Sequence, residues 1–134
     1  MKKFDNYVSH LRVLERADQE MLDNEFIISG IIDKFSIQFE LGWKMMKELL
    51  AYEGSSASAT GSPRSIIKEA YAVYPFFDGE VWLDMLRDRN DMAYIYDGSA
   101  ARELVGRILK EYIPAFVKLE EELNEKYGTI LNTL

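Results

Sequence analysis

Residues 82–97, WLDMLRDRNDMAYIYD, combine arginine, asparagine and tyrosine side chains at helical spacing. A helix turns by about 100° per residue, so the apolar positions of this segment share one stripe with an arginine. The stripe consists of Trp82, Met85, Leu86, Arg89, Ala93 and Tyr96. A guanidinium on an apolar face needs a partner, because an unpaired buried charge is costly. Arg89 is therefore the first residue to which we assign chemistry.

Two interpretations of Arg89 follow from its position on this stripe. In the first, the guanidinium forms an ion pair with a carboxylate of the long apolar segment at 26–52, either Glu40 or Glu48. In the second, it binds an anionic ligand, because the planar guanidinium fork suits a phosphate group. Spacing alone favours the ion pair.

Other familiar catalytic and metal-binding patterns are absent from the sequence. It has no HExxH, no Gly-rich phosphate loop, no GxSxG and no cysteine. The one histidine, His10, occupies a polar position beside Ser9 in the first predicted helix, which is typical of a surface residue. We therefore predict no metal site and no cofactor.

Apolar residues recur at helical spacing along five segments, and no segment alternates as a β-strand does. The predicted helices cover residues 3–22, 26–52, 63–74, 79–94 and 100–126. Short connections between about five helices favour an all-α, up-and-down helical bundle. We expect it to form a single domain over residues 1–134.

Capping residues and helix breakers determine the predicted boundaries. Ser62 and Pro63 are typical of an N-cap and a first helical position, and Asp78 can cap the next helix. The small polar residues at 55–62, SSASATGS, predict a surface loop. Pro114 should kink or interrupt the last helix, because proline lacks an N–H and its ring clashes with the preceding turn.

The helix predicted at 26–52 is apolar around much of its circumference, through Ile37, Leu41 and Met45 as well as its main stripe. Such a helix is either central to a core or pairs with another subunit, and we predict a homodimer. The alternative is that the other helices suffice to cover it. Gly42, within this helix, predicts a close approach by another helix.

Composition describes an acidic globular chain, with a net charge of -7 and a hydrophobic fraction of 48%. This charge disfavours non-specific phosphate binding, although Arg87, Arg89, Arg102 and Arg107 leave room for a local basic site. No stretch approaches the roughly eighteen uncharged apolar residues of a membrane span, and the N-terminus lacks the apolar run of a signal peptide. We expect a cytoplasmic protein with no membrane partner.

Three stretches of the chain resemble the nucleotidyltransferase substrate-binding protein family, a branch of the HEPN superfamily. They are FELGWKMMKELL at 39–50, SPRSIIKEAY at 62–71 and EVWLDMLRDRNDMAYIYD at 80–97, and the likeness extends over residues 4–123. The resemblance implies a helical-bundle homodimer that acts with a minimal nucleotidyltransferase subunit. In several such pairs the HEPN subunit is a metal-independent RNase toxin, and the transferase is its antitoxin.

The last stretch corresponds to the family's Arg-x4-His-x-Tyr signature. By resemblance, Arg89 and Asn90 match the signature arginine and the polar residue after it, and Tyr96 matches the tyrosine that the partner can adenylylate. The chain departs from the signature at Tyr94, which replaces the histidine. It also reads KFS at 34–36, where relatives more often read RFE, so a carboxylate is missing there.

Tyrosine is a poor general base at neutral pH, because its usual pKa is near 10 whereas that of histidine is near 6.5. We therefore predict a non-catalytic or weakly active subunit that binds the transferase. Its nucleotide or RNA phosphate would lie in a cleft lined by Arg89, Asn90, Tyr94 and Tyr96, with Arg87 and Asp88 at the rim. One alternative is an RNase toxin that uses Arg89 with Tyr94 as catalytic residues. Another is an interaction module in which Arg89 only ties two helices together.

Overall fold

The computed structural model describes residues 1–55, 61–92 and 97–134, and over these residues it is all-α with no strand. The predicted fold class, an all-α helical bundle, is confirmed. The α-helices are α1 (Lys2–Leu14), α2 (Glu25–Tyr52), α3 (Pro63–Val73), α4 (Gly79–Asp91), α5 (Gly98–Arg107) and α6 (Ile113–Tyr127). The described residues also form the 3-10 helices η1 (Glu15–Gln19) and η5 (Gly128–Asn132) and the π-helix η4 (Ile108–Tyr112).

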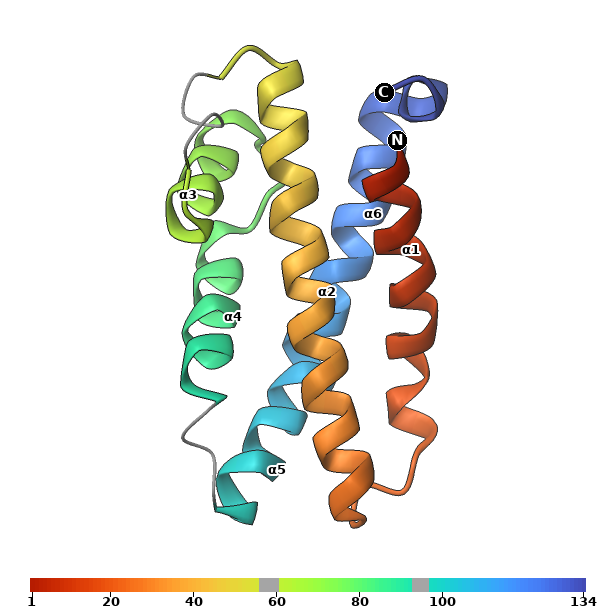
Figure 1. Cartoon of the computed structure of the whole chain (residues 1–134), viewed down its shortest axis with the longest axis vertical. Helices are drawn as coiled ribbons and strands as arrows, with labels where there is room; N and C mark the ends of the chain where they lie inside the picture. Colours follow the sequence, from red (N-terminus) through yellow and green to blue (C-terminus); the bar gives the residue numbers. More distant parts are fainter. Residues whose placement is uncertain (56–60, 93–96) are drawn as a thin grey trace.

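The bundle is built around α2, which runs along most of the length of the molecule (Figure 1). On one side of it lies α1, and on the other side α3 and α4 follow one another end to end. Behind it passes α6, so that the two ends of the chain lie close together at one end of the bundle. This arrangement lets α2 contact α1, α3, α4 and α5.

Helix boundaries follow the capping chemistry of the sequence. The Ser62 hydroxyl accepts a hydrogen bond from the Ser65 N–H at the start of α3, and the Asp78 carboxylate accepts one from the Val81 N–H at the start of α4, as predicted. The Asn24 side chain caps α2 in the same way, accepting from the Phe26 N–H at 2.8 Å. Each cap satisfies a backbone donor that the first helical turn leaves free.

The first helix is shorter than the prediction of 3–22. It ends at Leu14 and continues as the 3-10 helix η1, which keeps Ala17 buried. Met21, which falls inside the predicted range, is 70% exposed. The physical reason is the short connection to α2: the chain must reverse direction before the Asn24 cap, so Met21 falls in the turn.

The last predicted helix, 100–126, consists of α5, η4 and α6 in continuous succession. The interruption that Pro114 predicted is confirmed, because the π-helical turn of η4 ends two residues before the proline. Proline cannot donate to the preceding turn and its ring crowds a carbonyl there, and a π-helical turn is one way to relieve this conflict. Tyr112, at the end of η4, is completely buried.

Aromatic side chains form the centre of the core. The Trp82 ring stacks on Phe77, with centroids 5.3 Å apart, and meets Phe116 edge-on at 5.4 Å. It also lies 5.9 Å from the Phe39 ring of α2. Trp82 thereby joins α4 to both α2 and α6, and its position determines how the helix that carries Arg89 sits on the bundle.

Gly42 provides the close approach that the sequence predicted. A Cβ atom at this position would lie 2.5 Å from Cη2 of Trp82 and 3.2 Å from Cε2 of Tyr7, and both rings are fully buried. We expect Gly42→Ala to lower the free energy of unfolding by about 1–3 kcal/mol, because the packed rings must shift to admit the methyl group. Urea denaturation followed by circular dichroism measures this loss.

Gly30 supplies the matched control within the same helix. No atom lies within 4 Å of the position that its Cβ would take, so Gly30→Ala adds helix propensity without a clash. This variant should gain about 0.5–1 kcal/mol of stability. Equal effects of the two substitutions would show that the contact between Gly42 and Trp82 does not constrain the packing.

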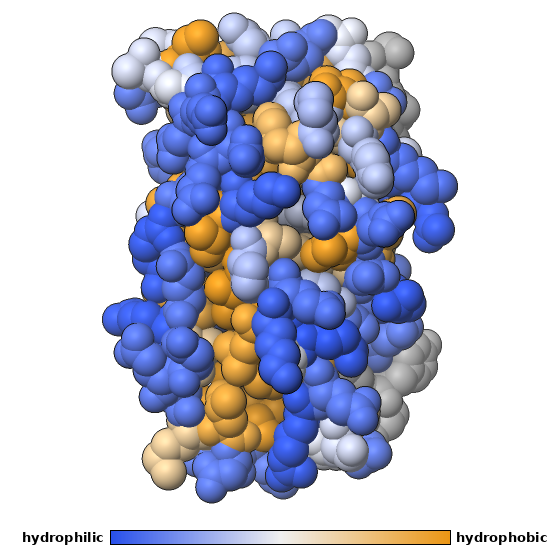
Figure 2. All heavy atoms as spheres, turned by 180° about the vertical axis from the view of Figure 1, so that it is seen from behind, coloured by the Kyte–Doolittle hydropathy of each residue, from blue (hydrophilic) through white to orange (hydrophobic). Residues whose placement is uncertain are grey.

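The surface is mainly charged, with apolar side chains gathered in part of it. Figure 2 shows such a group in the lower half of the rear face. On α2, Met45 is fully buried, whereas Ile37 is 48% exposed and Leu41 is half-buried, so the bundle covers the apolar circumference of this helix only in part. In the described ranges, no helix combines the length and apolar character needed to cross a membrane.

Candidate functional site

Arg89 points from α4 toward α2. Its Nη2 atom lies 3.0 Å from Oε1 of Glu40, and its guanidinium carbon lies 5.5 Å above the centre of the Phe39 ring. The side chain is 28% exposed. Of the two carboxylates suggested by the sequence, Glu40 is therefore the partner, whereas Glu48 pairs with Lys3 at 3.0 Å. The aromatic contact holds the guanidinium plane against the helix while one edge still reaches the surface.

Glu40 is shared between two cations. Lys44, one turn further along α2, places its Nζ atom 3.6 Å from Oε2 of Glu40. We call Arg89, Glu40 and Lys44 the arginine cluster. Its two positive groups outnumber its one carboxylate, so the cluster keeps a local positive charge within a chain of net charge -7.

One donor of the arginine cluster remains unused. The Nε atom of Arg89 is buried and has no hydrogen-bond acceptor among the residues that the structure describes. A buried donor without a partner is costly, and a phosphate oxygen or a carboxylate would relieve that cost. The cluster therefore carries a positive charge and a guanidinium that is only partly satisfied, although its Nε atom itself is closed to solvent.

Two of the predicted site residues, Tyr94 and Tyr96, lie outside the described residues, as does the whole segment 93–96. Asn90 is described and is exposed, directly after Arg89 near the end of α4. The structure therefore places Arg89 and Asn90 at one end of this helix. How the two tyrosines lie relative to them stays a prediction.

Asp88 does not lie at the rim of the site, as the sequence suggested, but is buried, with 7% of its surface exposed. Nε and Nη2 of Arg107 each donate to it at 2.9 Å, and the Tyr112 hydroxyl donates to its Oδ2 atom. Burial and the neighbouring Asp88 carboxylate raise the pKa of Tyr112 from its usual value. We call Asp88, Arg107 and Tyr112 the aspartate network; it joins α4 to the last residue of α5 and the last residue of η4.

The burial of Asp88 could have been predicted from its angular position on the helix. Asp88 lies only about 60° from Met85, at the edge of the apolar stripe, so partial burial could have been inferred. Arg87, in contrast, is exposed and pairs with Asp84 at 3.2 Å on the surface of the same helix. Of the two residues assigned to the rim, only Arg87 is accessible.

The four arginines that suggested a local basic site do not act together. Arg87, Arg89 and Arg107 are each paired with a different carboxylate, Asp84, Glu40 and Asp88 respectively. Arg102 is exposed on α5, where it lines a hollow together with the acidic residues Glu25 and Asp97. Positive charge is therefore left over at the arginine cluster, where Lys44 adds a second cation, rather than along α5.

His10 differs from the predicted surface residue, because it is half-buried between α1 and α2. Its Nδ1 atom lies 2.7 Å from Oε1 of Gln38, whose Nε2 donates to the Tyr7 carbonyl at 3.0 Å. Since the amide oxygen of Gln38 can only accept, Nδ1 of His10 must carry the proton. His10 thus ties the two helices together.

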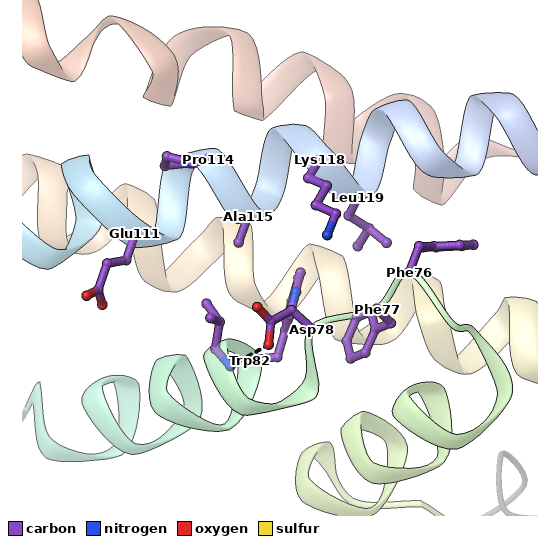
Figure 3. A pocket seen from close by; sticks show the side chains of 10 residues that line it. Phe76, Phe77, Asp78, Trp82, Glu111, Pro114, Ala115, Lys118 and Leu119 are labelled. Atoms are coloured by element: carbon purple, nitrogen blue, oxygen red, sulfur yellow. Dashed lines mark hydrogen bonds between the residues drawn. The ribbon is translucent and has the colours of Figure 1, made fainter.

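A hollow of about 220 Å³ lies between the start of α4 and α6 (Figure 3). Its wall is formed by Phe76, Phe77 and Trp82 on one side and by Pro114 and Lys118 on the other. The Asp78 carboxylate near its mouth is engaged as the α4 cap. This hollow does not include Arg89, and none of the described residues form a cluster of histidine and carboxylate side chains able to hold a metal ion.

Fold and site together define a helical-bundle protein whose arginine cluster joins α4 to α2. The family described as nucleotidyltransferase substrate binding protein like matches residues 2–125, nearly the whole chain. The protein therefore belongs to this family, and the resemblance seen in the sequence is confirmed. Comparison with curated proteins gives no match.

Proposed function

We propose that this protein is the binding subunit of a minimal nucleotidyltransferase and holds a nucleotide or RNA phosphate at the arginine cluster. The family name supports the role as a substrate-binding partner of a transferase. The observation that carries the phosphate assignment is the state of Arg89, which is half-buried, oriented by Phe39 and only partly satisfied by Glu40. Arginine in such a setting suits the bidentate recognition of phosphate.

The local charges fit this assignment. A phosphate that approaches Arg89 meets the repulsion of Glu40, but Lys44 on the same carboxylate offsets it. Asn90, exposed beside Arg89, can donate its amide to the same ligand. In this proposal Tyr94 and Tyr96 complete the cleft, and Tyr96 is the candidate acceptor when the partner adenylylates the subunit.

We further propose that the functional unit is a homodimer. Ile37 is a large apolar side chain exposed on α2, and the half-buried Leu41 follows it one turn later, next to Glu40. An isologous interface over this face would cover both side chains in each copy. It would also bring the two arginine clusters toward each other.

Arg89→Ala should weaken the binding of a short RNA or of ATP by roughly ten- to hundredfold, the usual effect of a lost charge-assisted hydrogen bond. Arg89→Lys should recover part of the affinity, because lysine keeps the charge but not the fork. Fluorescence anisotropy with labelled RNA, and competition by ATP, measures both variants.

Arg64→Ala provides the matched control, since Arg64 is exposed on α3 and belongs neither to the arginine cluster nor to the predicted rim. It should change the affinity little. If Arg89→Ala leaves binding unchanged but lowers the unfolding temperature, Arg89 serves only to tie α4 to α2. The protein would then be an interaction module.

A second candidate function is a metal-independent RNase toxin. The Arg-x4-Tyr-x-Tyr spacing from Arg89 to Tyr96 favours it, because it preserves two positions of the family signature. In this mechanism Arg89 would hold the scissile phosphate while Tyr94 replaced histidine in proton transfer. Tyrosine is ill suited to that task, so we place this function second.

A further inference from the structure

We propose that a hollow between α1 and α2 is a second phosphate-binding site, which takes the phosphate adjacent to the one held at the arginine cluster. The hollow has a volume of about 430 Å³, and we call it the lysine hollow. It is lined by the polar residues Lys2, Lys3, Asn6, Lys44 and Glu48 and by Leu41 and Leu134, so it adjoins the apolar face of α2 proposed for the dimer interface. This inference rests on the proposed function, because it extends the same ligand.

The side chains that line the lysine hollow carry an excess of positive charge. Three ammonium groups line it beside one side-chain carboxylate, that of Glu48; two of them are in ion pairs, Lys3 with Glu48 at 3.0 Å and Lys44 with Glu40 at 3.6 Å. Lys2 is exposed and has no ion pair among the described residues. Asn6 adds an uncharged amide donor. Flexible ammonium groups are common ligands of phosphate, and their concentration in one concave place is unexpected in an acidic chain.

Lys44 makes the lysine hollow continuous with the arginine cluster. It lines the hollow and is also paired with Glu40, which in turn holds Arg89. Glu40, Lys44 and Glu48 follow one another at intervals of four residues, so they form one stripe along α2. Arg89 of α4 reaches one end of this stripe, and Lys3 of α1 reaches the other.

The geometry of this stripe suits a chain of phosphates. One helical turn advances by about 5.4 Å, which is on the scale of one step of an extended nucleotide strand. A ligand with one phosphate at Arg89 would therefore present its neighbour to Lys44 and to the lysines of α1. Isolated surface lysines would not orient a chain of phosphates along α2 in this way.

The test removes the lysines that belong to the hollow but not to the arginine cluster. Lys2→Gln combined with Lys3→Gln is compared with Lys68→Gln combined with Lys110→Gln, two exposed lysines of α3 and η4. Both double variants remove the same charge. The probes are a short labelled single-stranded RNA and ATP, and affinity is measured by anisotropy and competition from about 50 to 200 mM salt.

The Lys2 and Lys3 double variant should bind RNA less tightly at low salt. Its plot of log affinity against log salt concentration should be shallower by about 0.7 for each lost contact. The control double variant should keep the slope of the unmodified protein. A loss for RNA alone assigns the hollow to the phosphates of a strand, and a loss for ATP as well assigns it to a polyphosphate; both support the site. Thermal unfolding verifies that each variant is folded.

Other outcomes separate this inference from the proposed function. If both double variants keep the slope while Arg89→Ala loses binding, the lysine hollow is overturned and the arginine site stands. If the lysine variant loses binding but Arg89→Ala does not, the hollow binds phosphate on its own and the proposed role of Arg89 is overturned. If the unmodified protein binds neither RNA nor ATP, both proposals are wrong.

Discussion

Tyr94→His should switch on RNA cleavage in the presence of EDTA, with a rate about two to four orders of magnitude above that of the unmodified protein. That factor is the usual contribution of a general acid–base. Histidine exchanges protons near neutral pH, whereas tyrosine seldom ionises there. Arg89, held between Phe39 and Glu40, would supply the positive charge that steadies the phosphate. Incubation of labelled RNA with each purified protein, followed by gel electrophoresis, gives the two rates.

Two further variants make the cleavage result specific. Adding Arg89→Ala to Tyr94→His should abolish the gained activity, whereas Tyr94→Phe should stay as inactive as the unmodified protein. Cleavage by the unmodified protein that Arg89→Ala stops would make Tyr94 a working substitute and the protein an RNase. If no variant cleaves RNA, the catalytic assignment of this segment is wrong and the interaction module becomes the better account.

Asp88→Ala should lower the free energy of unfolding by about 2–4 kcal/mol, one of the largest effects expected of a single polar substitution here. The change leaves the buried Tyr112 hydroxyl without its acceptor. It also removes the carboxylate to which Arg107 donates two hydrogen bonds. We expect a smaller loss of stability than the largest values for broken buried ion pairs, because the Arg107 side chain is partly exposed and can be hydrated once Asp88 is removed. Urea denaturation at neutral pH measures the loss.

Asp84→Ala is the matched control, one turn earlier on α4. Its partner Arg87 is exposed, so the cost should be at most about 1 kcal/mol. A loss of the same size in both variants would contradict a structural role of the aspartate network.

The aspartate network also determines how the stability of the fold changes with alkaline pH. The raised pKa of Tyr112 means that the folded protein keeps its proton at pH values where the unfolded chain has lost it. Its contribution to stability is therefore complete below the usual tyrosine pKa of 10.0 and is lost as the pH rises above it. Asp88→Ala removes one cause of the raised pKa, so stability should fall less steeply with alkaline pH in this variant.

Local features of the fold were predictable from the sequence, because they depend on neighbours in the chain. Ser62 and Asp78 satisfy N–H groups only three residues away, and Pro114 disturbs the turn that precedes it. The helical stripe likewise placed Arg89 toward the core. Family membership was also predicted from the sequence, and the family match over residues 2–125 confirms it. In contrast, the end of the first helix was misjudged, because the turn into α2 overrode a helical pattern that continued to Met21.

Only the tertiary structure decided which side chains meet across helices. Glu40 and Glu48 share one face of α2, and the height at which α4 packs against it decides that Arg89 reaches Glu40. That height depends on Trp82 seated against Gly42, a contact between helices far apart in the sequence. The contacts of Asp88 with Arg107 and Tyr112 also depend on how distant helices pack, and the π-helical turn of η4 determines where Tyr112 points. Periodicity determines which face a residue occupies, whereas the axial offset and rotation of packed helices determine its partner.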